Sequence, residues 1–143
     1  MKDTKMPLTL TYTEHKIPEN DVPKLGKHIT DAFLKWHGLS GNKVMTPNVT
    51  MQLLPLPKSA TLSGGELVEG VWLECKTPSF ALAERDVQVG FFQEVTDLIF
   101  EAAQGSIPRN RIFTNLVHTV DGTWNLDGAA LTNEQLGAAI AKG

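Results

Sequence analysis

Pro7 is the residue of this chain with the clearest chemical potential, because it directly follows Met6, a second methionine at which translation can start. In a chain started at Met6, the methionine is removed before the small proline, and Pro7 then carries a free secondary amine. An α-amino group titrates at about 7.7–8.0, against about 10.4 for lysine, so this amine is partly neutral near pH 7. Such a base suits proton abstraction beside a carbonyl. In a chain started at Met1, the Pro7 nitrogen is an amide without basicity, and Pro7 only begins an edge strand.

Proton abstraction beside a carbonyl also needs groups that hold the substrate. A cation binds a substrate carboxylate, and an amide polarises the carbonyl oxygen. Three basic side chains, Lys43, Lys76 and Arg85, are candidates for the cation. Asn115 stands between apolar residues of a strand-like segment, where it either faces a cavity or is a buried amide with its hydrogen bonds satisfied.

The remaining reactive side chains predict no metal or cofactor site. The chain has one cysteine, Cys75, so no internal disulfide and no thiolate cluster is expected, and we interpret Cys75 as a small buried hydrophobe. The four histidines, at positions 15, 28, 37 and 118, are interpreted as structural or solvated. No cofactor is required for the predicted chemistry, because the substrate's own carbonyl accepts the electrons.

Length and composition predict one globular domain with a small-molecule partner. The chain has 143 residues, 41% hydrophobic residues and a net charge of −3, which argues against nucleic-acid binding. No apolar run approaches the length of a membrane span, and no secretory leader is recognised, so a cytoplasmic protein is expected.

The first half of the chain contains a predicted strand, helix and second strand. Residues 8–13 alternate apolar and polar side chains, which is typical of a strand. Apolar residues recur at helical spacing over residues 25–36, and Gly38 ends the run. Residues 49–54 predict the second strand, which Pro55 stops.

The second half repeats this order with similar spacing. Residues 71–77 predict a strand, and Ser79 is predicted to cap a long amphipathic helix that ends at Gly105. Residues 111–118 predict the last strand. The spacing within each half leaves room for a crossover helix, so each half is expected to be a βαβ unit with parallel strands.

The predicted fold class is therefore α/β, with two pseudo-repeated βαβ units that form one mainly parallel four-stranded sheet with two helices on one face. One domain spans residues 1–143. Its expected parts are an amino-terminal extension (1–6), the two units (7–57 and 66–120) and a tail (121–143). We interpret the strands as apolar on both sides, so neighbouring subunits are expected to cover the second face.

The tail carries a short helix with a defined start. Thr132 and Gln135 form a capping-box pattern that predicts a helix over residues 133–141. This helix is weakly apolar, so we expect it to dock on a neighbouring subunit rather than on its own chain.

The order of these features resembles the tautomerase superfamily, and most closely the macrophage migration inhibitory factor and the cis-3-chloroacrylic acid dehalogenase-like enzymes. The resemblance covers most of the chain, from Pro7 to about Asn125. Besides the Met6-Pro7 start and the two βαβ halves, it rests on the following residues: Gly64-Gly65, Pro108, Arg111-Ile112-Phe113-Thr114-Asn115 and Trp124-Asn125.

The resemblance implies a site and an assembly. The family's amino-terminal proline matches Pro7, its lysine after the first helix falls near Lys43, and its strand aromatic and asparagine match Phe113 and Asn115. The family forms homotrimers with pockets between subunits. The dehalogenase-like members have two arginines near the start of the second helix, where this chain has Lys76 and, further on, Arg85, so the resemblance gives less support to dehalogenation.

Three functions remain open from the sequence. The first is keto–enol tautomerisation or isomerisation of a small 2-oxo or 2-hydroxy-enoic acid, with Pro7 as the base. The second is a non-catalytic oligomeric binding protein of the same fold, in which Met1 is retained. The third is a hydrolytic dehalogenase or a decarboxylase of the superfamily.

Overall fold

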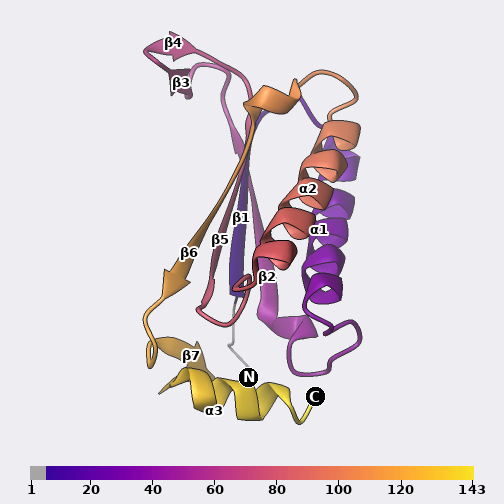
Figure 1. Ribbon diagram of the computed structural model, residues 1–143. Coiled ribbons are helices and arrows are strands. Elements are labelled where there is room, and N and C mark those ends of the chain that lie inside the picture. Colours follow the sequence, from indigo (N-terminus) through magenta and orange to yellow (C-terminus); the bar gives the residue numbers. More distant parts are fainter. Residues whose placement is uncertain (1–5) are drawn as a thin grey trace.

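The computed structural model of the protein describes residues 6–143, so residues 1–5 of the predicted extension lie outside the described part. One sheet is backed by two long helices (Figure 1). The long elements are β1 (Met6–Thr13), α1 (Val22–Trp36), β2 (Val49–Leu56), β5 (Val71–Pro78), α2 (Arg85–Ala102) and β6 (Ile112–Thr119). Short 3-10 turns precede α1, β2 and β6: η1 (Glu19–Asp21), η2 (Thr46–Asn48) and η3 (Arg109–Arg111).

The sheet joins two equivalent halves. Its strand order is β2-β1-β5-β6, with parallel pairs β1–β2 and β5–β6 and an antiparallel pair β1–β5 at the centre. The register repeats as well, because Met6 pairs with Val49 in the first half and Val71 pairs with Ile112 in the second. The predicted pair of βαβ units in a mainly parallel four-stranded sheet is confirmed.

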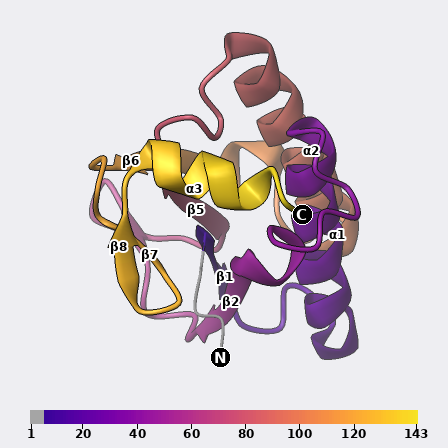
Figure 2. The same ribbon diagram turned by 90° about the horizontal axis from the view of Figure 1, so that it is seen from below.

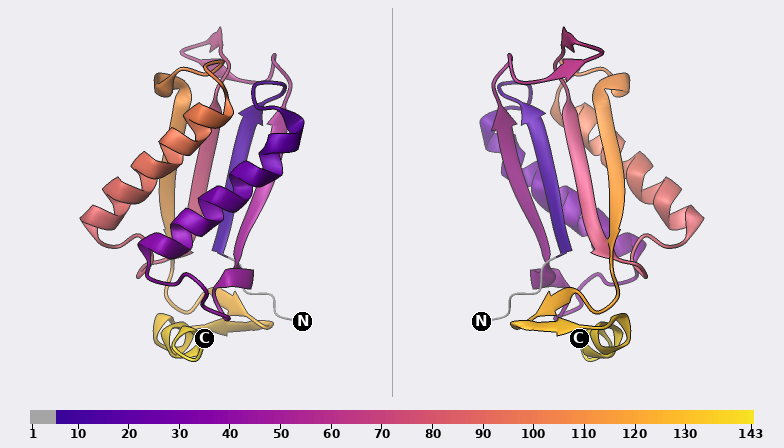
Figure 3. Two further views of the ribbon diagram at one scale, coloured as in Figure 1. Left: turned by 90° about the vertical axis from the view of Figure 1, so that its right-hand side faces the viewer. Right: turned by 90° about the vertical axis from the view of Figure 1, so that its left-hand side faces the viewer.

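Both long helices, α1 and α2, cover the same face of the sheet, and within residues 6–143 the other face carries no helix (Figure 3). Every second residue of a strand points toward the helices, so half of the side chains of each strand enter the core. Leu8, Leu10 and Leu73 are at most 1% exposed, and they meet Phe33 of α1 and Phe91 of α2, which are fully buried. This layer contains the main hydrophobic core of the described chain.

The second helix begins later than the sequence predicts. Ser79 does not cap it, because residues 79–84 form a loop and α2 begins at Arg85 after Glu84. Leu82 has a φ of +54°, a left-handed conformation that a right-handed helix cannot contain. The loop therefore separates β5 from α2.

A small hairpin extends from the connection between the halves. It pairs β3 (Leu62–Ser63) with β4 (Glu66–Leu67) across Gly64-Gly65. Both glycines have positive φ, which suits the tight turn. Leu62 and Leu67, which are cross-strand partners, are exposed.

The tail crosses the end of the sheet where β1 begins (Figure 2). It consists of β7 (Trp124–Leu126), β8 (Ala129–Leu131) and α3 (Asn133–Ile140). The predicted capping box of Thr132 and Gln135 is confirmed. The expectation that α3 has little to bury in its own chain is wrong, because Leu136 is fully buried and the Ile140 carbonyl accepts a hydrogen bond from Asn42 Nδ2 at 3.1 Å.

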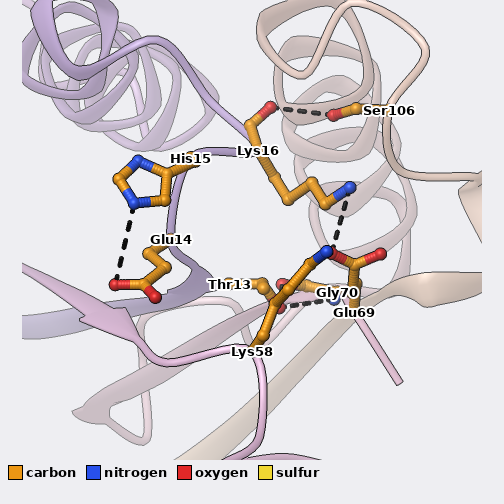
Figure 4. Close-up of polar contacts among 8 residues, drawn as sticks. All are labelled: Thr13, Glu14, His15, Lys16, Lys58, Glu69, Gly70 and Ser106. Carbon is orange, nitrogen blue, oxygen red and sulfur yellow. Dashed lines mark hydrogen bonds and ion pairs between the residues drawn. The ribbon is translucent and has the colours of Figure 1, made fainter. Parts of the chain in front are cut away.

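The opposite end of β1 is held by polar contacts between segments that are distant in sequence (Figure 4). Thr13 and Gly70 are joined by two hydrogen bonds: the Thr13 N–H donates to the Gly70 carbonyl, and the Gly70 N–H donates to the side-chain oxygen Oγ1 of Thr13, both at 3.0 Å. Lys16 pairs with Glu69 at 3.0 Å, and the Ser106 hydroxyl donates to the Lys16 carbonyl at 2.8 Å. These contacts tie the two βαβ units together away from the start of β1.

Candidate functional site

The helix-free face of the sheet, here called the open face, contains a hollow of about 610 Å³. Three adjacent strands, β1, β5 and β6, supply its walls. The lining residues are Thr9, Thr11, Trp72, Glu74, Lys76, Phe113, Thr114 and Asn115. Three of them, Lys76, Phe113 and Asn115, belong to the set predicted from the sequence.

The register of the sheet explains why these residues meet. Side chains that are paired across adjacent strands point to the same face, so they form rows. One row joins Thr11, Trp72 and Phe113, and the next joins Thr9, Glu74 and Asn115. The single-residue alternation of each strand thus builds the hollow from three separate parts of the chain.

One wall of the hollow is aromatic. Trp72 and Phe113 stack nearly in parallel, with ring centroids 5.6 Å apart and an interplanar angle of 9°. Phe113 stays 39% exposed, so the pair presents apolar surface to the outside. A planar apolar group can lie against such a wall.

The polar part of the hollow contains an ion pair. Lys76 Nζ lies 3.2 Å from Glu74 Oε1, and both side chains are about half exposed. The lysine can also bind an anion from solvent, since an exposed ammonium group has three donors. Glu74 was not selected from the sequence, although the spacing of Trp72, Glu74 and Lys76 in a strand already placed all three on one face.

Pro7 shares the open face with the hollow but does not line it. It pairs with Thr50 in the β1–β2 ladder, and strand alternation places it on the same face as Thr9 and Thr11. Its nitrogen is joined to Met6, which itself pairs with Val49. In this chain the nitrogen is therefore an amide, and it becomes a base only when Met6 is removed.

Lys43 and Arg85 lie apart from the hollow. Lys43 is exposed in the loop between α1 and η2, and Arg85 is exposed at the first position of α2, 3.5 Å from Gln88 Oε1. Neither lines the hollow. Both nevertheless belong to the end of the sheet at which β1 begins, because β2 starts there and the antiparallel β5 ends there.

The open face is more polar than we predicted from the sequence. Threonines, a charged pair and Asn115 alternate with the core residues of β1, β5 and β6, so the interpretation of these strands as apolar on both sides is wrong. Exposed apolar side chains remain on this face, including Leu54 and Val117.

Cys75 and two of the four histidines have structural positions. Cys75 is fully buried, and burial raises the pKa of its thiol to about 12, so the predicted role as a buried hydrophobe is confirmed. His37 and His118 both form hydrogen bonds to the loop of residues 79–84. Within residues 6–143, no group of three or more His, Cys, Asp or Glu side chains could hold a metal ion. Among the helices of this described part, none has the length and apolar character needed to cross a membrane.

Comparison with known proteins identifies the fold. No protein-family model matches the chain, and no curated protein matches it. Solved structures do match it over nearly their full length. The structure of Pt0534 inactivated by 2-oxo-3-pentynoate is 15% identical, with a TM-score of 0.74, over 92% of this chain and 99% of that one.

Two further structures extend the comparison. A fused 4-OT, described as an asymmetric trimer, is 13% identical with a TM-score of 0.73, over 92% of this chain and 98% of its own. A macrophage migration inhibitory factor-like protein from Entamoeba histolytica is 17% identical with a TM-score of 0.68, over 87% of this chain and 97% of that one. These structures come from the tautomerase superfamily, so the predicted resemblance is confirmed at the level of the fold.

Proposed function

We propose that the protein is a keto–enol tautomerase, or a related isomerase, of a small 2-oxo or 2-hydroxy-enoic acid, with Pro7 as its base once Met6 is removed. The observation that carries the proposal is that Lys76, Phe113 and Asn115 line one hollow on the sheet face that also bears Pro7. The similar structure of Pt0534, which 2-oxo-3-pentynoate inactivates, supports a 2-oxo acid as the substrate class.

The proposed reaction moves one proton between carbon and oxygen. The free amine of Pro7 takes a proton from the carbon beside the carbonyl, the C–H electron pair becomes a carbon–carbon double bond, and the carbonyl oxygen takes the negative charge. Asn115 donates a hydrogen bond to that oxygen, which then takes a proton from the protonated amine of Pro7 to form the enol and restore the neutral amine. Lys76 binds the carboxylate, and Phe113 keeps water from the reacting carbon. The reverse sequence gives the keto acid.

The proposed assembly is a cytoplasmic homotrimer with a small-molecule carboxylate substrate and no cofactor. Exposed apolar residues on the open face favour its coverage by further copies of the chain. The fused 4-OT structures, which are described as trimers, support an assembly of this kind. Lys43 and Arg85 are retained as alternative carboxylate-binding residues, because both stand at the end of the sheet where Pro7 lies.

A second candidate function is a non-catalytic oligomeric binding protein of the same fold. The observation that favours it is the bond between Met6 and Pro7, since an amide nitrogen cannot take a proton near pH 7. A superfamily dehalogenase or decarboxylase is the third candidate. It receives less support, because Arg85 is the one arginine between residues 76 and 108.

The test compares two forms of the protein that differ at the amino terminus. A chain that starts at Met6 and is trimmed to Pro7 should ketonise phenylenolpyruvate or 2-hydroxymuconate at least about tenfold faster than the chain that starts at Met1, because general-base catalysis typically contributes roughly 10²–10⁴-fold. Intact mass spectrometry establishes which amino terminus each sample carries. Pro7→Ala in the trimmed form leaves a primary amine and should lose only part of the rate.

A matched pair of lysine variants tests the hollow in the trimmed form. Lys76→Ala should raise KM for the carboxylate substrate, whereas Lys24→Ala, at an exposed lysine of α1, should leave it unchanged. Equal rates for the two amino termini would exclude Pro7 as the base and favour either the binding protein or an unrelated base such as His118.

A further inference from the structure

We propose that His37 is an acid-sensitive clip: its neutral ring holds the loop of residues 79–84 against the end of α1, and protonation of the ring releases the loop. The loop connects β5 to α2, and His37 stands directly after the last residue of α1. This device is independent of the proposed enzymatic function, because it depends on the fold alone.

The hydrogen bonds of His37 define its protonation state. Its Nδ1 lies 2.7 Å from the Phe33 carbonyl oxygen, which can only accept, so Nδ1 carries the proton. Its Nε2 accepts the backbone N–H of Leu82 at 2.8 Å, so Nε2 carries none. Only the neutral ring satisfies both contacts. A protonated ring has a donor at each nitrogen, and it would place an N–H against the N–H of Leu82.

The conformation of the loop depends on the hydrogen bond between His37 and Leu82. Leu82 is fully buried and has a φ of +54°, so its N–H cannot turn to water without a change of backbone conformation. Its carbonyl accepts from Gln88 Nε2 at 2.8 Å, which ties the same residue to the first turns of α2. A buried N–H that loses its partner is costly, so loss of the histidine acceptor favours opening of the loop.

A second histidine on the same loop provides an internal contrast. His118 Nε2 lies 2.9 Å from the Ala81 carbonyl oxygen, so this ring donates. Protonation of His118 leaves that donor in place. The Asn133 side chain also donates to Ser79 Oγ at 2.7 Å, and neither this amide nor this hydroxyl takes up a proton in mild acid. Among these contacts, acid therefore breaks the one that His37 accepts.

The surroundings of His37 favour the neutral ring. Burial lowers the pKa of His37, while the Phe33 carbonyl raises it to a smaller extent. Its ring packs on the Phe33 ring at 4.4 Å. The charged groups of the neighbouring segments are otherwise engaged or exposed: Lys35 pairs with Glu94 at 2.5 Å, and Glu84, Arg85 and Asp86 lie in solvent at the start of α2.

The direction of the pH effect follows from this shift. The pKa of His37 in the folded protein lies below the value of about 6.5 expected in the unfolded chain. The contact therefore contributes its full stabilisation of the folded state above about pH 6.5. That stabilisation is lost as the pH falls through the pKa of His37 in the folded protein.

The test is amide hydrogen exchange of the full chain at pH values above and below the one at which the His37 ring becomes protonated, as read from its ¹⁵N shifts, with rates corrected for intrinsic exchange. Protection of the Ala81 and Leu82 amides, which donate to the Pro78 carbonyl and to His37, should fall by roughly tenfold in acid, as expected for loss of one buried hydrogen bond. Amides within α1 should keep their protection, since the release is local.

Two matched variants identify the group responsible. His37→Gln offers an amide oxygen that accepts from Leu82 without titrating, so its loop should show no pH dependence. His28→Gln, at an exposed histidine of α1, should retain the dependence of the original chain. If His37→Gln does not fold, ¹⁵N shifts of the original protein should still show His37 as the Nδ1–H tautomer, with a pKa below the ordinary value of about 6.5.

Three exchange results would overturn the proposal. They are equal loop protection with the His37 ring neutral and protonated, a loss of α1 protection in parallel with the loop, and an unchanged pH dependence in His37→Gln. An Nε2–H tautomer of His37 would also contradict the geometry on which the clip depends.

Discussion

The two faces of the sheet are built from the same strands but differ in how completely one chain covers them. The helix-covered face is apolar and closed, with Leu10, Phe33 and Phe91 fully buried. The open face carries the Glu74–Lys76 ion pair and the partly exposed Phe113. Stability is thus concentrated on one face, and the groups that can bind a ligand or another copy of the chain are concentrated on the other.

The difference follows from strand alternation. Each strand supplies both faces in turn, so neighbouring residues such as Leu73 and Glu74 meet opposite environments. A substitution on the covered face removes packing that this chain completes by itself. A substitution on the open face changes groups that depend on solvent, ligand or a further subunit.

The largest expected effect is a truncation on the covered face. Phe33→Ala should lower the free energy of unfolding by about 3–5 kcal/mol, because it leaves a cavity against Phe91, whose ring meets Phe33 edge-on at 5.6 Å. Urea denaturation measures the loss. Lys27→Ala on the exposed side of α1 is the control and should change stability by less than about 1 kcal/mol. A loss below about 1 kcal/mol for Phe33→Ala would contradict a core completed within one chain.

An intermediate effect is expected where the two helices touch. A Cβ at Gly90 would overlap the Trp36 ring, so Gly90→Ala should cost about 1–3 kcal/mol in overpacking, which outweighs the gain of at most about 1 kcal/mol for alanine in a helix. Gly137→Ala in α3 is the matched control, because a Cβ there meets open space. Thermal denaturation should show opposite signs for the two variants. The same sign for both would show that α1 and α2 can move apart at low cost.

The smallest expected effect on the single chain lies on the open face. Phe113→Ser removes the stack on Trp72 and should cost about 1 kcal/mol of unfolding free energy at low protein concentration. The same change should weaken self-association, which sedimentation equilibrium measures at higher concentration. A destabilisation as large as that of Phe33→Ala, with unchanged association, would remove the distinction between the faces.

Local patterns were sufficient to predict most elements. The alternation in residues 8–13, the helical spacing in residues 25–36 and the Thr132–Gln135 capping box depend on neighbours in the sequence, and all three are present in the structure. The repeat of two βαβ units followed from the same signals. Such features can be predicted because the interactions that produce them span only a few residues.

The errors concern segments whose conformation depends on distant partners. Ser79 has the chemistry of a helix cap, yet His37 from α1 and His118 from β6 hold the following residues as a loop. The tail helix has few apolar residues, yet Leu136 finds a buried position in its own chain. His37 and His118 are both distant from Ser79 in the sequence, so no local pattern indicates their contacts with the loop.

The candidate site was likewise predicted only in part from the sequence. Lys76 and Asn115 were selected from the sequence by residue type and position, Phe113 by the resemblance to the tautomerase superfamily, and Pro7 by its place after Met6. Only the tertiary structure decided that the first three share a hollow with Glu74 and Trp72, and that Lys43 and Arg85 lie outside it. The sequence by itself determined which side chains alternate on each strand, since that depends on backbone geometry. Strand order and register decided which of them meet, because those depend on how the two halves pack together.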